Sequence, residues 1–277
     1  MLKKFDLKID KDIDEVFQLL KQNSKAYIVG GYVRDRLLGI EPKDCDFCTT
    51  LSLDEIFKLF SDKEKFHLSI ISEALNIVKL RYKKKNYEIA RLRKDLEYYS
   101  NRKDFDFIFV DDIEKDLPRR DFTINSIAYD GENLIYTDEE NLKDIERREI
   151  RFVGEAGKRI LEDPFRMLRL FRFFSEKSLL EIDNAALEAI NKHKNLIWTL
   201  PKEMINKEFI AIIKGENYLN TFYYINKVKL FDEEFNITDY KESYEERLRE
   251  LFRNSDLSLL EKLNFSKKMI IKIKNKI

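Results

Sequence analysis

The sequence predicts an α+β fold, with a mixed β-sheet and flanking helices in the N-terminal part and an all-α region after it. Two observations lead to this prediction. Residues 27–46 read as an apolar strand, a Gly-Gly turn, a short helix and a strand that starts at Asp44, and residues 76–93 read as two strands joined by lysines. From Gly157 onward, apolar residues recur almost wholly at helical spacing.

The composition limits the class of protein. The chain has 277 residues, 43% hydrophobic and 38% charged, which is enough for two or three modules. Its formal net charge is zero, so a surface for a nucleic acid would have to be a local basic patch. Residues 1–14 lack the apolar core of a signal peptide, and no apolar run is long enough to span a bilayer. Two thiols in a chain of this length suit a reducing cytosol, and we expect a cytoplasmic protein.

The helices and turns of the first part follow from local patterns. Residues 11–22 carry apolar side chains at helical spacing and predict an amphipathic packing helix. Residues 52–61 repeat the pattern, with Ser52 placed as an N-cap. The lysines at 83–85 are expected to form a solvated hairpin tip rather than an RNA contact.

Two cysteines lie in a C-D-F-C stretch that resembles half of a zinc site. Cys45 and Cys48 have no second pair to join, and the two histidines lie far away in the sequence. The pattern therefore argues against a zinc site here.

Two acidic residues in the same stretch are better candidates for a metal site. Asp44 and Asp46 are two apart on a predicted strand, so both carboxylates can reach one metal cluster. Oxygen ligands of this kind suit Mg²⁺, which usually binds one or two carboxylates and phosphate oxygens. Gly30 and Gly31 allow close backbone approach, and Arg34 lies within a turn of them. The pattern favours a triphosphate cradle beside a metal pair, and the alternative is a surface turn before a charged strand edge.

A second candidate site begins at Arg119 with the letters RRDFTIN. Asp121 is suited to cap a helix that would run through Ala128. A helix N-terminus beside two arginines would bind anions. The alternative is a charged cap on a buried helix.

The third candidate site is a helix in residues 162–173, with Asp163 at its N-cap. Arg166, Arg169 and Arg172 recur along one side of it. Cytosine and adenine present an amino donor beside a ring-nitrogen acceptor, which matches a carboxylate that accepts and a guanidinium that donates. Asp163 with Arg166 could therefore select these bases, since uracil and guanine would leave groups unpaired at a cost of about 1–3 kcal/mol each. The alternative is that Asp163 only caps and the arginines face solvent.

These three motifs occur in an order that resembles the class II tRNA nucleotidyltransferases (CCA-adding enzymes) and the bacterial poly(A) polymerases. The likeness runs from about residue 24 to about residue 215 and fades toward the C-terminus. The resemblance implies a nucleotidyltransferase head (the catalytic palm) in residues 1–148, a helical neck with a base-selecting helix in 149–215, and a helical body or reduced tail in 216–277.

The resemblance also implies roles for individual residues. Asp44 and Asp46 would bind Mg²⁺ and catalyse, and Glu88 would complete the set of carboxylates if its side chain points toward them. CMP and AMP would be transferred from CTP and ATP to the 3′ end of tRNA, with contacts to its acceptor stem. The implied nucleotide-binding set is Gly30, Gly31, Arg34, Arg120 on the triphosphate, Asp121 and Asn125 near the ribose, Asp163 and Arg166 on the base, and Arg169 and Arg172 in support of the template or on phosphates.

Departures from the family pattern leave alternatives open. Residues 138–145 lack the glycines of the relatives, and Met204 stands in the place of a motif arginine. The interval between Arg93 and Arg119, where the resemblance places a flexible loop, has its full length, which favours an enzyme able to add A. The tail looks short, and the lysine-rich segment after residue 266 is either a solubilising face or an RNA contact. A-only addition, CC-only addition and poly(A) synthesis remain alternatives, as does a catalytically idle RNA- or nucleotide-binding module.

Overall fold

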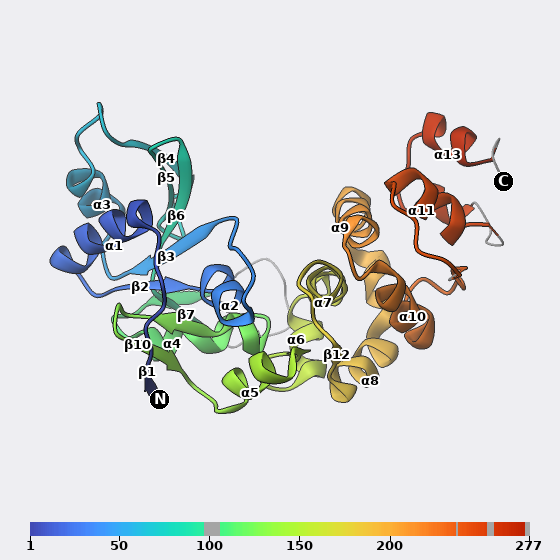
Figure 1. Ribbon diagram of the computed structural model, residues 1–277, viewed down its shortest axis with the longest axis horizontal. Coiled ribbons are helices and arrows are strands. Elements are labelled where there is room, and N and C mark those ends of the chain that lie inside the picture. Colours follow the sequence, from blue (N-terminus) through green and yellow to red (C-terminus); the bar gives the residue numbers. More distant parts are fainter. Residues whose placement is uncertain (97–105, 237, 254–257, 275–277) are drawn as a thin grey trace. The chain divides into compact units, whose positions relative to one another are not determined.

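The computed structural model describes residues 1–96, 106–236, 238–253 and 258–274. The chain divides into two compact units, Met1–Glu146 and Arg147–Ile277 (Figure 1). The first unit contains a mixed eight-stranded sheet with helices, and the second is almost entirely helical. The predicted α+β class is therefore confirmed, while the finer division into a neck and a body at residue 215 stays a prediction.

The large sheet has the strand order β1-β10-β9-β2-β3-β6-β5-β4. Its strands are β1 (Leu2–Lys4), β2 (Ala26–Val29), β3 (Cys45–Thr49), β4 (His67–Ser72), β5 (Ile77–Tyr82), β6 (Lys85–Arg91), β9 (Ile127–Tyr129) and β10 (Asn133–Tyr136). β3 pairs with β6 in parallel, and β2 and β5 flank this pair in antiparallel register. The parallel pair therefore lies inside the sheet, where its register is held from both sides.

One face of the sheet is packed against a helix. α1 (Lys11–Asn23) buries Ile13, Val16, Phe17 and Leu20, the apolar positions of the predicted amphipathic helix. Phe17 stacks on Phe47 of β3 at 6.1 Å between ring centroids, and Phe47 lies 5.9 Å from Tyr87 of β6. Odd-numbered side chains of β3 and β6 therefore form the buried face of the parallel pair.

The other face of the sheet is covered only in part. Buried apolar side chains of β3 and β6, including Cys48 and Ala90, join a cluster with Ile113 of α4 (Ile113–Asp116) and Leu117 of the 3₁₀ turn η1 (Leu117–Arg119). A small hairpin of β7 (Arg93–Asp95) and β8 (Phe107–Phe109) extends from β6. Residues 97–105, which belong to the predicted flexible-loop interval between Arg93 and Arg119, lie outside the described residues.

The predicted helix from Asp121 through Ala128 is wrong. The chain makes one 3₁₀ turn, η2 (Thr123–Asn125), and then enters β9, which pairs with both β2 and β10. Phe122 rather than Asp121 precedes the turn, and no side chain caps it. Pairing on both sides buries Ile127–Tyr129, and this tertiary gain overrides the local helical pattern. The anion site expected at a helix N-terminus is therefore not formed.

Three further strands of the large sheet, β1, β4 and β10, were not predicted from the sequence. β1 pairs with β10, and β4 pairs with β5 at the edge of the sheet. Ile70 and Ile71 of β4 are 51% and 52% exposed, so the strand lacks the alternation of a half-buried strand. Between Ile70 and Ser72 the register shifts at a β-bulge. The side chains of this edge strand are thus polar or exposed on both faces. Its sequence therefore lacks the alternation of apolar and polar residues that would predict a strand.

The remaining helices of the first unit match the sequence signals more closely. α2 (Gly31–Leu38) follows the Gly-Gly turn, and α3 (Leu53–Leu59) begins with a capping box of Ser52 and Glu55. The hairpin between β5 and β6 turns at Lys83 and Lys84, which both have positive φ. Lys83 is not merely solvated, because it bridges to acidic residues of α1.

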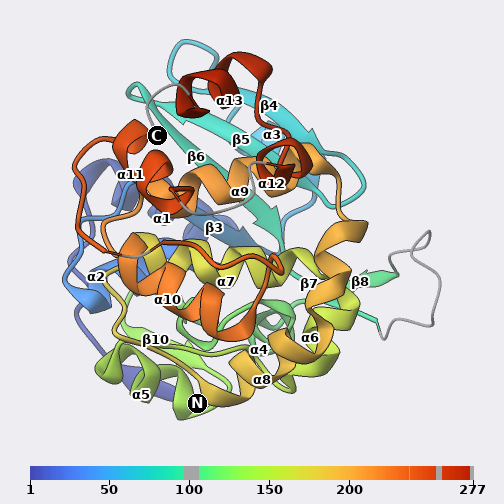
Figure 2. The same cartoon turned by 90° about the vertical axis from the view of Figure 1, so that its right-hand side faces the viewer.

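The second unit is almost entirely helical (Figure 2). Aromatic rings pack against one another between its helices. Phe209 lies 5.3 Å from Phe231 and 5.7 Å from Phe222 between ring centroids. The helices are α6 (Ala156–Glu162), α7 (Phe165–Glu176), α8 (Asn184–His193), α9 (Lys202–Lys214), α10 (Tyr218–Val228), α11 (Tyr244–Leu251), α12 (Ser258–Lys262) and α13 (Lys267–Lys274), and β11 (Glu149–Ile150) pairs with β12 (Glu181–Ile182). α7 packs against α9 and α10.

The helical pattern predicted from Gly157 onward is interrupted before Pro201. A 3₁₀ segment, η3 (Lys194–Thr199), ends before Pro201, and α9 starts after it, because proline disfavours helical backbone in the residue before it. Trp198 packs edge-on against Phe231 at 6.0 Å, as a partly buried rather than a fully buried core residue. Among the described residues, no helix combines the length and the apolar character needed to cross a membrane.

Candidate active site

The strongest site candidate is a set of carboxylates on the open part of the sheet. Asp46 of β3 and Glu88 of β6 are direct partners across the parallel pair. Partners in neighbouring strands project from the same face, so the two carboxylates lie side by side. Asp44 immediately precedes β3, and all three residues are exposed. The sequence left open whether Glu88 points toward the aspartates, and the register brings it beside Asp46.

The carboxylates of Asp46 and Glu88 repel each other. The surrounding protein and the neighbouring Glu88 raise the pKa of Asp46 to about 6, although Arg120 partly opposes the rise. Glu88 is exposed at its surface, but the protein around it removes part of its hydration and so raises its pKa, and Arg93 opposes this effect. Within the described residues, no three His, Cys, Asp or Glu side chains are already grouped as a metal site. Paired hard oxygens under mutual repulsion nevertheless fit a divalent cation such as Mg²⁺, which needs only one or two carboxylates when phosphates supply other ligands.

Arg120 lies over β2 and β3, next to the carboxylates. Its guanidinium donates to Asp116 Oδ2 at 3.1 Å and to Cys48 Sγ at 3.4 Å. Gly30 has φ +65°, and a Cβ there would come within 3.2 Å of Arg120 Nη1. The positive backbone angle favours glycine at this position, and a Cβ there would also press on the Arg120 guanidinium.

Asp116 lies in this region but is not among the residues that the sequence predicted for the site. Its side chain is fully buried and accepts from Arg119 Nε at 2.9 Å, from Arg120 and from the backbone N–H of Arg93 at 3.1 Å. Burial alone would raise the pKa of Asp116, but Arg120 and Arg119 outweigh it and lower the pKa. The acid-to-arginine spacing of three and four residues in DLPRR was the signal that could have revealed this cluster.

Arg34 joins the Gly-Gly turn to the 3₁₀ turn η2. Its side chain is 3% exposed, pairs with Asp35 at 2.7 Å and donates to Asn125 Oδ1 at 2.6 Å. Asp121 lies partly buried just before this turn, and Gly31 begins α2. The structure therefore brings Arg34 and Asn125 together, but as a buried contact within the first unit.

The segment at 138–145, which lacks the family's glycines, forms most of α5 (Glu140–Arg147). Asn141 and Asp144 of this helix are buried. Thr123 Oγ1 donates to Asp144 at 2.6 Å, and Asn141 donates to the Thr123 carbonyl at 2.7 Å. A helix held by buried polar contacts thus replaces the expected glycine turn and anchors η2.

The proposed base-selecting pair lies at the junction of α6 and α7 in the second unit. The predicted N-cap role of Asp163 is wrong by one residue, because Asp163 is the C-cap of α6 and Pro164 is the N-cap of α7. Asp163 Oδ1 accepts from the Phe165 N–H at 3.0 Å, which holds its carboxylate at the start of α7. Arg166 is 8% exposed and donates to Glu162 at 2.6 Å and to the Arg159 carbonyl at 2.8 Å. Glu162 is therefore an acidic partner of Arg166 that the sequence analysis did not assign.

The other two arginines of α7 differ in their surroundings. Arg172 pairs with the buried Glu208 of α9 at 2.5 Å and with Glu176 at 3.1 Å, so it ties two helices together. Arg169 is partly buried on α7. Glu208 belongs to the stretch in which Met204 replaces a family arginine, and its ion pair with Arg172 holds α9 against α7.

The two cysteines do not share a site. Cys45 and Cys48 are buried, and an odd spacing places them on opposite faces of β3. Burial raises the pKa of Cys48 to about 12, so its thiol stays protonated beside Arg120. This geometry is incompatible with a shared zinc ion, which binds thiolates.

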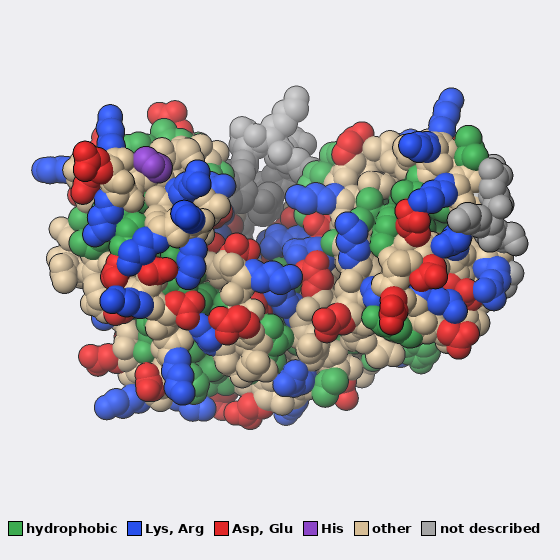
Figure 3. All heavy atoms as spheres, turned by 45° about the horizontal axis from the view of Figure 1, so that its top comes forward, with side chains coloured by type: hydrophobic (Ala, Val, Ile, Leu, Met, Phe, Trp, Pro, Cys, Tyr) green, Lys and Arg blue, Asp and Glu red, His purple; other side chains and the backbone are tan. Residues whose placement is uncertain are grey.

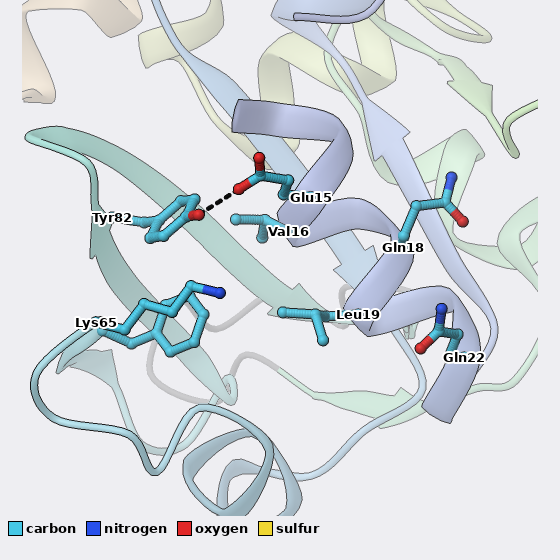
Figure 4. A pocket seen from close by; sticks show the side chains of 8 residues that line it. Glu15, Val16, Gln18, Leu19, Gln22, Lys65 and Tyr82 are labelled. Carbon is cyan, nitrogen blue, oxygen red and sulfur yellow. Dashed lines mark hydrogen bonds between the residues drawn. The ribbon is translucent and has the colours of Figure 1, made fainter. Parts of the chain in front are cut away.

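A pocket of about 270 Å³ lies between α1 and the loop and strand that carry Lys65 and Tyr82 (Figure 4). Tyr82 donates to Glu15 at its rim, and Val16 and Leu19 form its apolar wall. Tyr82 is on the same face as Leu80, two residues away on β5, and Leu80 is paired in register with Tyr87. The pocket therefore opens on the α1 side and is separate from Asp46 and Glu88.

Comparison with known proteins identifies similar chains. Residues 26–151 match the family described as the poly A polymerase head domain. The CCA-adding enzyme of Staphylococcus aureus strain MRSA252 is 34% identical over 215 residues, which cover 78% of this chain and 52% of that enzyme. The enzyme of strain Newman is 33% identical over the same shares. This chain thus spans about half the length of the curated relatives it matches.

Solved structures show a similar fold. A crystal structure of the Bacillus stearothermophilus CCA-adding enzyme in complex with CTP has a TM-score of 0.81 and 25% identity, over 96% of this chain and 69% of that one. The Thermotoga maritima CCA-adding enzyme complexed with tRNA has a TM-score of 0.73 and 21% identity, over 99% and 72% of the two chains. The latter likeness concerns the fold alone.

Substitution of Asp116 tests the arginine cluster. In Asp116→Asn, Arg119 and Arg120 lose their charged partner, and we expect the free energy of unfolding near neutral pH to fall by on the order of 3 kcal/mol. The folded pKa of Asp116 lies below its unfolded value of about 4, so this contribution is complete above that pH and is lost as the pH falls through the folded pKa. Denaturant unfolding of both proteins at several pH values measures the difference.

The exposed Asp54→Asn variant is the matched control, and its stability should follow that of the unchanged protein. A destabilisation by Asp116→Asn that stays constant from neutral pH to about pH 3 contradicts a charge-based role for Asp116.

Proposed function

We propose, from the premise that this chain belongs to the family of class II CCA-adding enzymes and poly A polymerase head domains, that it adds CMP and AMP from CTP and ATP to the 3′ end of tRNA without a nucleic-acid template. The observation that carries the proposal is the parallel register that sets Asp46 beside Glu88, with Arg120 over the neighbouring strand. The proposal includes a cytoplasmic location, because Cys45 and Cys48 are free thiols.

Asp44 and Asp46 are the residues that we propose to hold Mg²⁺, with Glu88 beside them. A divalent cation held there would lower the pKa of the attacking 3′-hydroxyl and neutralise charge on the phosphates. Their exposure leaves them accessible to substrate, and the raised pKa of Asp46 is the expected sign of carboxylates that a cation would stabilise.

Arg120 is proposed to bind the triphosphate. Asp116 and the space left by Gly30 fix its guanidinium, so little reorganisation accompanies phosphate binding. Arg34 and Asn125 support the same region through their buried hydrogen bond, with Gly31 and Asp121 as neighbours. Catalysis by such an arrangement depends mainly on positioning and charge, as expected for phosphoryl-type transfer.

Asp163 and Arg166 are proposed to select the base, with Arg169 and Arg172 behind them. Glu162 and the Arg159 carbonyl hold the Arg166 guanidinium, which fixes the direction of its remaining donors. A fixed donor beside a carboxylate acceptor can match the edges of cytosine and adenine. The ion pair of Arg172 with Glu208 gives it a supporting role in this helix.

The proposal is tested by incorporation of nucleotide into defined RNAs. We expect Mg²⁺-dependent incorporation of CMP into a tRNA that lacks CCA and of AMP into one that ends in CC, measured with one labelled nucleotide at a time. AMP incorporation alone, CMP incorporation alone or long A tails would instead identify the A-adding, CC-adding or poly(A)-synthesising alternatives. Absence of incorporation with every RNA would favour the idle binding module.

Substitution of the aspartates tests the metal assignment. We expect Asp46→Ala, and likewise Asp44→Ala, to abolish incorporation while nucleotide still binds, because the triphosphate contacts of Arg120 remain. Filter binding of labelled ATP and single-turnover incorporation measure the two effects. The exposed Asp54→Ala variant is the control, and unchanged turnover in either aspartate variant overturns the assignment.

Substitution of Arg166 tests the choice of base. We expect Arg166→Ala to relax selection, so that UTP and GTP compete with CTP and ATP. The wrong base leaves hydrogen-bonding groups unpaired at a cost of about 1–3 kcal/mol each, and this penalty is lost when the guanidinium is removed. Competition between labelled nucleotides measures the ratio of kcat/KM values. Lys158→Ala, an exposed change on α6, is the control. Intact selectivity in Arg166→Ala shows that the base is chosen elsewhere.

A further inference from the structure

The face of the sheet that carries Asp46 and Glu88 continues as an open polar surface across the outer strands. Glu88 is paired with Lys79 of β5, and Lys79 is paired with Ser69 of β4. A second row, one pleat away, runs from Asn86 of β6 through Arg81 to His67. Paired residues project to the same face, so these side chains form one surface with the carboxylates at its inner end.

This surface is open, whereas the next row of the same face is covered. Lys79, Arg81, Asn86, His67 and Ser69 are all exposed. One step farther along the strands, Cys48 and Ala90 belong to the buried cluster with α4, and Ile77 packs against it. The fold therefore covers the apolar row and leaves the two polar rows accessible beside the candidate metal site.

The basic residues of this surface differ from those at the nearby hairpin tip. Lys83 and Lys85 bridge to acidic residues of α1. By contrast, within residues 1–96, 106–236, 238–253 and 258–274, neither Lys79 nor Arg81 forms an ion pair with an acidic side chain. Figure 3 shows Lys and Arg interspersed with Asp and Glu on the visible surface, as expected for a chain of zero net charge. Lys79 and Arg81 are therefore two adjacent cations that no ion pair holds, with Glu88 as the cross-strand neighbour of Lys79.

Positive charge lies on both sides of the carboxylates, in two different forms. Over β2 and β3, Arg120 is fixed by Asp116 and packed against Gly30, which suits one small anion at a defined position. Over β5, Lys79 and Arg81 are exposed on an extended strand, which suits a flexible polyanion. Neighbouring strands are about 4.8 Å apart, so Lys79 lies about one strand spacing from Glu88.

We infer that these two rows bind the single-stranded 3′ end of the RNA substrate, with Lys79 and Arg81 on its phosphates. The inference rests on the proposed function, because only a polymerising reaction needs a primer strand beside the carboxylates. The terminal hydroxyl then meets Asp46 and Glu88 from the β5 side, while the incoming triphosphate lies on the Arg120 side. Asn86 and Ser69 offer hydrogen bonds to sugar hydroxyls, which distinguish RNA from DNA.

The double substitution Lys79→Ala and Arg81→Ala tests the surface. We expect a severalfold rise in KM for a tRNA that ends in CC, while KM for ATP stays unchanged. The slope of log affinity for a short single-stranded RNA against log salt should become shallower by about 1.4, or about 0.7 for each cation removed. The charge reversal Lys79→Glu should also raise the KM for this tRNA. Lys79→Arg, which keeps the positive charge, should leave that KM close to the value of the unchanged protein.

Lys58→Ala with Lys63→Ala is the matched control, because it removes the same charge from exposed positions outside the two rows. Equal shifts in both double variants would mean that only net charge matters and would overturn the inference, as would an unchanged RNA KM and salt slope in the Lys79 and Arg81 variant.

The failure of this inference differs from the failure of the proposed function. If the unchanged protein incorporates nucleotide but the surface variants behave like it, only the surface is wrong. If the unchanged protein incorporates nothing into any RNA, the proposed function fails. The inference then fails with it, whatever the protein's affinity for the short single-stranded RNA.

Discussion

The parallel pairing of β3 with β6 is the constraint on which the rest of the first unit depends. It sets Asp46 against Glu88 on one face and Cys45 against Tyr87 on the other. Because side chains alternate, a slip of one residue would bury the carboxylates against α1 and expose the aromatic rings. The stacking of Phe17 on Phe47 therefore stabilises the core and also determines which face of the sheet carries Asp46 and Glu88.

The second requirement is that the cations near this pair are held without being neutralised. Asp116 lies beneath Arg119 and Arg120 and is fully buried, so it orients the guanidinium groups from the protein side. Arg120 remains close enough to Asp46 to oppose the rise in its pKa. In the second unit, Glu162 and Glu208 hold Arg166 and Arg172 in a comparable way. Acidic side chains that position arginines thus recur in both units, and two of them, Asp116 and Glu208, are buried.

Much of this architecture was predictable, because it rests on local patterns. Helix α1 and the cap at Ser52 were predicted from periodicity and from cap chemistry. The strand β9 was not, because its pairing with β2 joins residues about 100 positions apart in the sequence, in addition to its pairing with the adjacent β10. Glu88 could be named but not oriented, since only the register determines its face. The sequence suggested Asp163 as the acidic partner of Arg166. Helical spacing of four residues also allows an ion pair with Glu162, and this is the ion pair that the structure contains.

The edge strand β4 has a consequence for the behaviour of the molecule in concentrated solution. An exposed strand bearing Ile70 and Ile71 offers unpaired backbone groups to which a strand of another molecule could add. The bulge between Ile70 and Ser72 breaks the regular spacing of those groups at the point where the isoleucines are most accessible. The bulge thus disfavours the pairing of β4 with a strand of another molecule and the growth of fibres.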